Sequence, residues 1–233
     1  MSPETIYEDG TYLAKNRTWH EEDSAWKATH VRRILERNNI VPSTLCEVGC
    51  GAGEILKCLA DKYGPNVLFS GYEVSPQAFA ICKKKEAQNL HYFLKNLLDE
   101  DGSFFDVVMA LDVFEHVENY IAFLRELRAK GKYKVFHIPL DLSVQTVLRG
   151  SPISAVRERY GHIHYFTKDM ALAALKAAGY EVTDYFYTAG NLELPNLDRK
   201  KRLMKLPRRL FFALHQDLAV RILGGFSLLV LAK

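Results

Sequence analysis

The residues with the clearest chemical potential are the glycines of Glu47-Val48-Gly49-Cys50-Gly51-Ala52-Gly53, which follow a short apolar run and precede a helical pattern. A G-x-G-x-G turn between a strand and a helix brings the backbone close to a ligand and directs free N–H groups at it. Dinucleotide-binding enzymes have G-x-G-x-x-G at the same place. The turn alone therefore predicts a nucleotide-like ligand without identifying it.

Acidic residues around this turn narrow the choice of ligand. Position 54 is Glu, so the third glycine of the dinucleotide pattern is absent. Glu47 precedes the turn, where a carboxylate is a poor neighbour for a pyrophosphate and a good one for the ammonium and sulfonium charges of S-adenosylmethionine. Glu73 ends the next apolar run, where an acid can accept hydrogen bonds from both ribose hydroxyls. These residues favour S-adenosylmethionine over NAD; a solvated strand-end carboxylate is the alternative for Glu73.

A second set of residues could act as a general base on an acceptor hydroxyl. His116 and Asp141 each follow an apolar run, and His162 lies in a short segment after a long connection. A positioned base typically contributes about 10²–10⁴-fold to such a reaction. His162 and His116 are our candidates for the base, and Asp141 is the third catalytic candidate. A structural role within its own loop is the alternative for His116, and His137, inside an apolar run, is expected to be a satisfied core residue.

The elements that must position these residues alternate between strand and helix. Helical spacing marks 23–38, 54–62 and 119–130, and further helices are expected after the caps Ser75 and Thr167. Such alternation implies a mainly parallel sheet covered on both faces, with the chemistry at the carboxyl ends of its strands. We expect a Rossmann-like, doubly wound α/β fold. The predicted strands are 44–48, 67–72, 91–94, 105–111, 133–138, 180–187 and 226–232.

Length and composition limit the class of protein. A chain of 233 residues that is 48% hydrophobic and 25% charged is long enough for one sizeable core. Its net charge of +3 is small, and we expect no nucleic-acid partner. The N-terminus lacks a secretory pattern, no window is apolar enough to span a membrane, and the four cysteines form neither a disulfide framework nor a zinc motif. We therefore expect a cytoplasmic protein with reduced cysteines and no metal.

The chain resembles the class I S-adenosylmethionine-dependent methyltransferases, in the broad group that includes the ubiquinone-biosynthesis O-methyltransferases. The resemblance covers roughly Trp19 to Lys233 and rests on three features besides Glu73. They are the glycine turn, the segment from Phe105 through Asp112-Val113-Phe114-Glu115-His116-Val117, and Gly161-His162-Ile163-His164-Tyr165-Phe166-Thr167. The resemblance implies a seven-stranded sheet, mostly parallel, whose last strand runs antiparallel between the fifth and the sixth.

The resemblance also implies where the cofactor binds. Adenine contacts would fall just after the third strand, although the family usually has an acid near Asn96, and Leu111 would lie beside the methionine sulfur. The N-terminal helix, with Trp19, Trp26 and Lys27, resembles a cap that closes over the cofactor; the alternative is that both Trp residues are core. The expected cofactor-binding residues are Glu47, Gly49, Cys50, Gly51, Gly53, Glu73, Val74, Asn96, Leu97, Leu111 and Trp26.

The expected organisation is a helical cap at 1–40 and a cofactor-binding domain at 41–233 with two insertions. A lid insertion at about 141–166 carries three arginines that could meet a phosphate or carboxylate of the acceptor, or could be surface charge. A basic helical insertion at about 191–222 carries seven positive charges between Arg199 and Arg209, interleaved with apolar residues. It could contact an anionic membrane or a polyanion, or be a solvated helix with its apolar face packed on the sheet.

We therefore expect transfer of a methyl group from S-adenosylmethionine to a small-molecule acceptor, at oxygen, by in-line displacement. The acceptor could be a sugar derivative, a lipid-linked molecule or another secondary metabolite. One alternative is a non-catalytic S-adenosylmethionine-binding regulatory or assembly subunit. The other, an NAD-dependent oxidoreductase, is disfavoured by Glu47 and by the glutamate at position 54.

Overall fold

A seven-stranded sheet is the centre of the computed structural model, which describes residues 16, 19, 21–195 and 199–233, with only the backbone of 199–202. The strands are β1 Thr44–Val48, β2 Leu68–Glu73, β3 Leu90–Leu94, β4 Phe105–Leu111, β5 Gly131–Leu140, β6 Val182–Thr188 and β7 Phe226–Ala232. Their order is β3-β2-β1-β4-β5-β7-β6, and all neighbours are parallel except β7, which is antiparallel to both β5 and β6. The predicted fold, including the antiparallel last strand, is confirmed.

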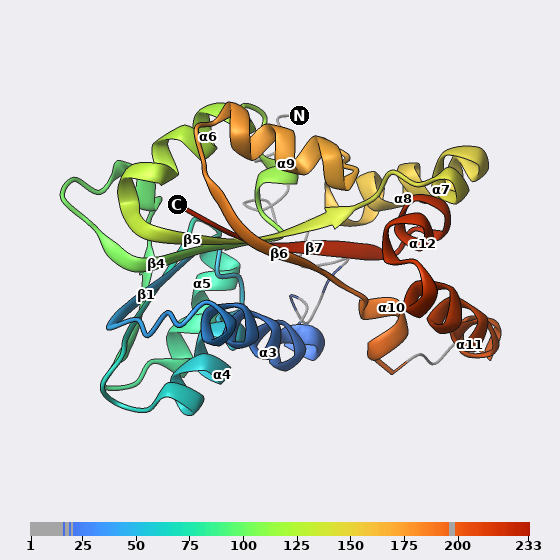
Figure 1. Ribbon diagram of the computed structural model, residues 1–233. Helices are drawn as coiled ribbons and strands as arrows, with labels where there is room; N and C mark the ends of the chain where they lie inside the picture. Colours follow the sequence, from blue (N-terminus) through green and yellow to red (C-terminus); the bar gives the residue numbers. More distant parts are fainter. Residues whose placement is uncertain (1–15, 17–18, 20, 196–198) are drawn as a thin grey trace.

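Helices cover both faces of this sheet (Figure 1). Helices α6 and α9 pack on one face, where Leu124 and Leu175 are fully buried, and α3 and α4 pack on the other, where Ile34 and Leu59 are buried. The described helices are α3 Glu21–Arg37, α4 Glu54–Tyr63, α5 Pro76–Cys82, α6 Tyr120–Leu127, α7 Val144–Arg149, α8 Ser151–Tyr160, α9 Lys168–Ala177, α10 Gly190–Glu193, α11 Arg199–Leu214 and α12 Gln216–Leu223.

Local sequence explains where several of these helices begin. Ser75 caps α5 with Pro76 at its first turn, and Thr167 caps α9 by accepting a hydrogen bond from Met170 N, both as predicted. The first helix differs from its prediction of 23–38, because α3 begins at Glu21. Asp23 therefore lies in the first turn, where it forms an ion pair with Lys27 one turn later.

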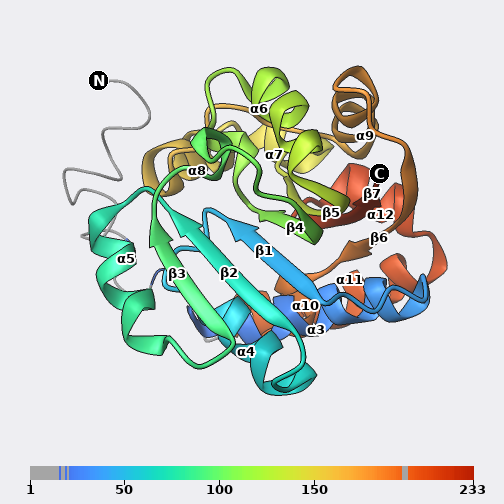
Figure 2. The ribbon, with the colours of Figure 1, turned by 90° about the vertical axis from the view of Figure 1, so that its left-hand side faces the viewer.

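The strand order creates a crevice at the carboxyl ends of the central strands. β1 pairs with β2 on one side and with β4 on the other, so the chain leaves β1 in one direction and later returns on its opposite side. Figure 2 shows β1, β2 and β3 side by side, all running the same way. Ligands in such folds bind outside the carboxyl ends of the strands at this switch point. Glu47, Glu73 and Leu111 lie at or beside these ends.

The two predicted insertions lie at the same end of the molecule (Figure 1). The connection after β5 contains α7 and α8, and the connection between β6 and β7 contains α10, α11 and α12. Of the predicted cap at 1–40, the part before residue 21 lies outside the described residues except for Asn16 and Trp19. No described helix is long and apolar enough to cross a membrane.

Candidate functional site

A cavity of about 1010 Å³ lies at the carboxyl ends of the strands. The glycine turn after β1, the ends of β2 and β4, and the helix α3 form one part of its wall. The loop after β4, the end of β5 and helix α8 form another part. The cavity therefore occupies the switch point of the sheet, where the sequence predicted the chemistry to be.

The glycines of the turn differ in the structural requirement that each one meets. Gly49, Gly51 and Gly53 all have positive φ, which is strained for other residues. A Cβ on Gly53 would lie 2.6 Å from both Cys82 and Tyr92, so this glycine permits close packing of the turn on the core. A Cβ on Gly51 would meet only Trp19, at 3.8 Å, among the described atoms. Gly51 therefore leaves open space in the cavity wall that a ligand can approach.

Glu73 ties the glycine turn to the end of β2. Its Oε2 accepts a hydrogen bond from Gly51 N at 2.8 Å, and its Oε1 accepts from Val74 N at 2.9 Å and Ser75 N at 2.8 Å. Burial raises the pKa of Glu73, and these three N–H donors partly offset that rise. Oε2 has only one described donor and can accept a further hydrogen bond, so the carboxylate both shapes the turn and faces the cavity.

Glu47 lies beside the glycine turn and has fewer described hydrogen-bond partners than Glu73. Its side chain is buried, it lines the cavity, and its Oε2 has no hydrogen-bond partner among the described residues. Burial raises the pKa of Glu47 well above its usual range, and the nearby Lys27 ammonium only partly offsets this. A buried carboxylate without a partner is costly, and a cationic ligand would compensate for that cost.

A chain of polar contacts connects helix α3 to the sheet beside the cavity. Lys27 Nζ lies 2.8 Å from Asp112 Oδ2, and Asp112 Oδ1 lies 2.6 Å from His137 Nδ1. The other ring nitrogen of His137 lies 2.8 Å from Thr188 Oγ1. Burial alone would raise the pKa of Asp112, but His137 and Lys27 hold it well below its usual range. His137 is thus the satisfied buried histidine that the sequence predicted, and it also lines the cavity.

Helix α3 also closes the cavity with an aromatic side chain. Trp26 lines the cavity, and its Nε1 donates a hydrogen bond to Glu193 of α10 at 2.6 Å. Its ring meets the His137 ring edge-on, with the ring centroids 6.1 Å apart. Trp19 lines the same cavity. Both Trp residues therefore line the cavity, and neither belongs to the buried core of the sheet.

The predicted catalytic residues meet in another part of the cavity wall. His162 Nδ1 lies 2.7 Å from Asp141 Oδ2, and the His162 and His116 rings are 4.9 Å apart. All three residues line the cavity. His164, two residues further on, instead lies 3.0 Å from the Val117 carbonyl oxygen, outside the cavity lining. A histidine paired with a carboxylate has a fixed orientation and a stabilised cationic form, which is how proton-accepting histidines are commonly arranged.

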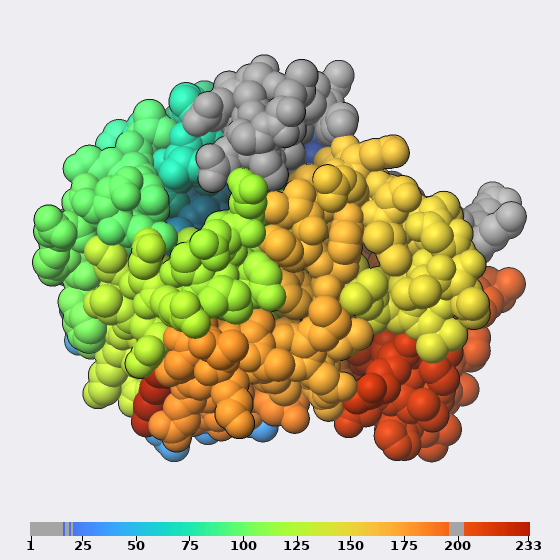
Figure 3. Space-filling model, turned by 90° about the horizontal axis from the view of Figure 1, so that it is seen from above, coloured from blue at the N-terminus to red at the C-terminus, as the bar shows by residue number. Residues whose placement is uncertain are grey.

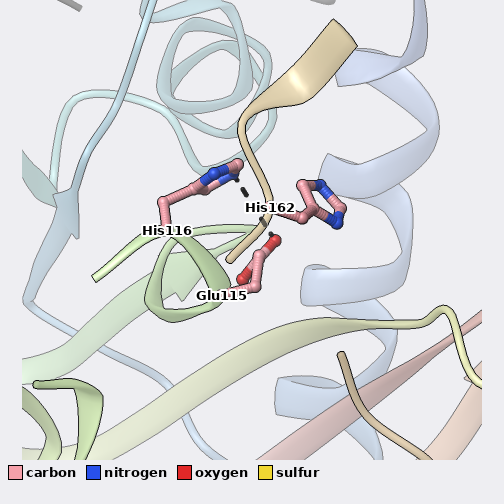
Figure 4. A group of neighbouring side chains, drawn as sticks. All are labelled: Glu115, His116 and His162. Atoms are coloured by element: carbon pink, nitrogen blue, oxygen red, sulfur yellow. Dashed lines mark ion pairs between the residues drawn. The ribbon is translucent and has the colours of Figure 1, made fainter. Parts of the chain in front are cut away.

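Glu115 lies between these two histidines (Figure 4). It is fully buried, neither carboxylate oxygen has a hydrogen-bond partner among the described residues, and Oε1 lies 3.9 Å from His116 Nε2. Burial raises the pKa of Glu115 well above its usual range, and the Asp112 carboxylate adds to that rise. One atom each of Glu115, His116 and His162 lie within 4.8 Å of one another, which is the ligand type and spacing of a metal site.

The structure brings together nearly all residues predicted for the site. Of the predicted cofactor-binding residues, Leu97 is the exception, because its side chain is fully buried in the core beneath the sheet edge and the adjacent Leu98 lines the cavity instead. The arginines considered for acceptor binding are exposed and absent from the lining, so that hypothesis is not supported. These are Arg149, Arg157 and Arg159.

Sequence reasoning missed several residues of the site. Asp112 was noted only as part of a motif, and Thr188 was not considered, although both are central to the contacts of His137. Phe123 and Val156 add apolar surface to the cavity and were also missed. A helical or strand pattern alone does not distinguish an apolar residue facing a cavity from one facing the core.

Comparisons with known proteins agree with this geometry. Residues 18–185 match the family model described as a methyltransferase domain. No curated protein sequence matches the chain. The chain is similar in structure to magnesium protoporphyrin IX methyltransferase (ChlM) from Synechocystis PCC 6803, solved with bound S-adenosylhomocysteine. The TM-score is 0.66, the identity 15%, and the match covers 98% of each chain.

Two plantazolicin methyltransferases have the same fold, both solved with a desmethyl-plantazolicin analog and S-adenosylhomocysteine. BamL matches with a TM-score of 0.61 and 15% identity, covering 99% of this chain and 96% of that one. BpumL matches with a TM-score of 0.58 and 17% identity, covering 96% of this chain and 87% of that one. At such identities these likenesses concern the fold.

Proposed function

The chain belongs to the class I S-adenosylmethionine-dependent methyltransferases, and on that premise we propose that it methylates an oxygen atom of a small-molecule acceptor, with His162 as the base. The observation that carries this proposal is the 2.7 Å contact between His162 Nδ1 and Asp141 in the wall of the cavity. A hydroxyl acceptor must lose a proton, whereas a strongly nucleophilic acceptor needs no such base. An oriented histidine therefore favours a hydroxyl.

The residues of the glycine turn fit the cofactor. Considering only the described residues, Gly51 leaves open space at the wall, Glu47 has a buried oxygen without a partner, and Glu73 can accept a further hydrogen bond. When bound, S-adenosylmethionine supplies an electrophilic methyl group on a positively charged sulfur. Glu47 would compensate that positive charge and the ammonium, and Glu73 would accept the ribose hydroxyls. The other proposed contacts are Gly49, Cys50, Gly53, Val74, Asn96, Leu111 and Trp26, all of which line the cavity.

The base follows from the hydrogen-bond pattern of His162. With Nδ1 donating its proton to Asp141, the lone pair is on Nε2, which can then accept the proton of an acceptor hydroxyl. Asp141 stabilises the imidazolium that results. Phe123, Leu140 and Val156 add apolar surface to the cavity wall, which would disfavour water beside the acceptor. Orientation of the acceptor relative to the methyl group would supply the rest of the rate enhancement.

We propose that the chain is a member of the ubiquinone-biosynthesis-like group and that its acceptor is a hydroxyl-bearing sugar derivative, lipid-linked molecule or other secondary metabolite. The Glu115-His116-Val117 segment after β4, and His162 within the segment before α9, support membership of that group. The proposed location is the cytoplasm, because Cys46, Cys50, Cys58 and Cys82 are all free thiols. The basic segment Arg199–Arg209 is the proposed contact with an anionic membrane or a polyanion.

The base can be tested by methyl transfer from radiolabelled S-adenosylmethionine to a panel of phenols, catechols and hydroxylated polyprenyl compounds. His162→Ala should lower kcat by about 10²–10⁴-fold, and Asp141→Asn by a smaller factor. Both should leave the affinity for S-adenosylhomocysteine unchanged. His164→Ala is the matched control, because His164 lies in the same segment but outside the cavity lining. Undiminished kcat in both His162→Ala and His116→Ala would refute a histidine base.

A divalent metal ion is the second candidate for activating the acceptor hydroxyl. The observation that favours it is Glu115, whose two oxygens are buried beside His116 and His162 without a hydrogen-bond partner in the part of the chain that the structure describes. A bound metal would lower the pKa of a coordinated hydroxyl and make a histidine base unnecessary. Activity that survives exhaustive dialysis against a chelator supports the base. Activity that is lost on dialysis and restored by Zn²⁺ or Mn²⁺, together with metal in the purified protein, supports the metal.

A further inference from the structure

Helix α11 turns much of its apolar surface to solvent. The sequence alone allowed its apolar face to pack on the sheet, but among the described large apolar side chains of the helix only Phe211 and Phe212 are half-buried. The other large apolar side chains are exposed by 53–85%, and we call them the leucine face of α11. They are Leu203, Met204, Leu206, Leu210 and Leu214.

The described basic side chains hold the helix in this orientation. Arg209 donates to the Leu192 carbonyl oxygen at 2.7 Å, Arg208 donates to the Gly224 carbonyl oxygen at 2.5 Å, and Lys205 donates to the Leu194 carbonyl oxygen. On the same side, the Phe212 ring stacks on the Phe226 ring at 4.9 Å. The polar side of α11 is therefore bound to α10 and to the turn before β7, and the leucine face is directed away from the protein.

Helix α7 adds apolar surface at the same end of the molecule. Val144, Val147 and Leu148 are all more than half exposed. α7 packs on α12, which packs on α11, and Figure 3 shows α7 and the C-terminal helices side by side. Single exposed apolar residues are common on protein surfaces, whereas a group of this size on adjacent helices marks an interaction site.

The charge of α11 identifies the partner. The helix carries seven Lys or Arg residues and no acid, and the rest of the chain has a net charge of −4. A two-fold dimer through the leucine face would bring two such helices together, and their like charges would repel each other. Exposed leucines beside concentrated positive charge are instead the features of a helix that lies in the interface of an anionic bilayer. We propose that α11, assisted by α7, docks this end of the protein on an anionic lipid bilayer.

The docking surface and the cavity share structural elements. Leu194 lines the cavity, and its carbonyl oxygen accepts the hydrogen bond from Lys205 of α11. Phe226 also lines the cavity and stacks on Phe212 of α11. The acceptor that fits this arrangement is a hydroxyl-bearing lipid or lipid-linked molecule held in the bilayer. This choice of acceptor rests on the proposed methyl transfer to oxygen, whereas the docking itself does not.

Docking can be tested by sedimentation of the full chain with vesicles of phosphatidylcholine and phosphatidylglycerol, compared with pure phosphatidylcholine. The wild type should bind the anionic vesicles, and binding should fall with rising salt. Leu206→Ser/Leu210→Ser should lower the partition coefficient at least tenfold. Val41→Ser/Phe104→Ser is the matched control, because both residues are exposed apolar residues far from α11 in the sequence, and it should bind like the wild type.

Three results would overturn the proposal. The first is a wild type that stays in the supernatant at low salt, and the second is a leucine variant that sediments like the wild type. The third is self-association of the wild type that the leucine variant abolishes, which would make a second copy of the chain the occupant of the leucine face. Affinity for S-adenosylhomocysteine should be the same in all three proteins, so loss of docking is distinguishable from failure of the proposed chemistry.

Discussion

The carboxylate of Glu47 couples ligand binding to proton release. It is buried in the cavity wall, one of its oxygens has no described hydrogen-bond partner, and burial raises its pKa well above the usual range. A cation bound beside it stabilises the ionised form and lowers that pKa again. In the pH range where Glu47 is protonated in the free protein, binding of a cationic ligand should release that proton, so the affinity should increase with pH there.

We therefore predict that the affinity for S-adenosylmethionine rises with pH above the ordinary titration range of a glutamate, by up to about tenfold per pH unit. Glu47→Gln should bind more weakly and lose this slope, because its amide does not titrate. Calorimetric titration in two buffers with different ionisation enthalpies measures both the affinity and the proton release. An unchanged slope in Glu47→Gln would assign the dependence to another group, with Glu73 as the next candidate.

Residues of the cofactor site were predictable where their roles depend on local sequence. The glycine turn and Glu73 directly follow or end predicted strands, so their spacing in the sequence was sufficient to place them at the carboxyl ends of those strands. Asp112 was not predictable, because its partners Lys27 and His137 come from distant parts of the chain and its positive φ is unusual outside glycine. Leu97 was predicted to face the cofactor, but its side chain faces the core and that of the next residue, Leu98, lines the cavity. Neighbouring side chains point in different directions, so an error of one position in the sequence places the wrong residue at the cavity.

Helix α3 is attached to the sheet at both of its ends. Near its start Lys27 contacts Asp112 after β4, and at its end Arg37 and Asn38 contact Asp184 of β6. The Lys27 contact lies at the cavity, with both partners largely buried. Breaking a buried ion pair leaves one charge without compensation, which costs more than the pair itself contributes. The attachment of α3 should therefore depend strongly on Asp112, which has two partners.

We predict that Asp112→Ala lowers the free energy of unfolding by about 3 kcal/mol, and that Lys27→Met lowers it less. Because both changes remove the same contact, the double variant should be less destabilised than the sum, with a coupling of about 1–2 kcal/mol. Urea denaturation of the four proteins completes the cycle. Arg37→Met, which removes an exposed contact of the same helix, is the control and should cost under about 1 kcal/mol. If the losses of unfolding free energy in Lys27→Met and Asp112→Ala simply add in the double variant, the contact between these residues does not attach α3 to the sheet.

Elements were predicted best where they are buried on both faces. The strands 105–111 and 226–232 were predicted with their observed bounds, because near-continuous apolar runs have few alternatives in a doubly wound fold. The orientation of α11 was not predictable. An amphipathic pattern shows that a helix has two faces, but here hydrogen bonds from its basic side chains to carbonyl oxygens bind the polar face to the protein. Such partners are visible only in the folded chain.

At the scale of the whole molecule, the proposed cofactor site lies at the switch point of the sheet. The glycine turn that lines it joins β1 to α4, and the cavity wall includes α3, β4 and β5. A ligand bound only by the folded chain stabilises it by RT ln(1 + [L]/Kd), or about 2.7 kcal/mol at a hundredfold excess over Kd. In a domain of this size that corresponds to a rise in Tm of about 5–10 °C.

We predict this rise for S-adenosylhomocysteine and none for NAD at the same concentration. Gly51→Ala should largely lose the rise, because its methyl group would enter the open space at the cavity wall. Gly102→Ala is the control, since Gly102 also has positive φ and no described atom lies within 4 Å of its added Cβ. Both variants incur the backbone strain of a left-handed alanine, about 1–2 kcal/mol, so both should melt several degrees lower without ligand. Only Gly102→Ala should keep the full rise with ligand; an equal rise in both would show that the ligand does not approach the turn at Gly51.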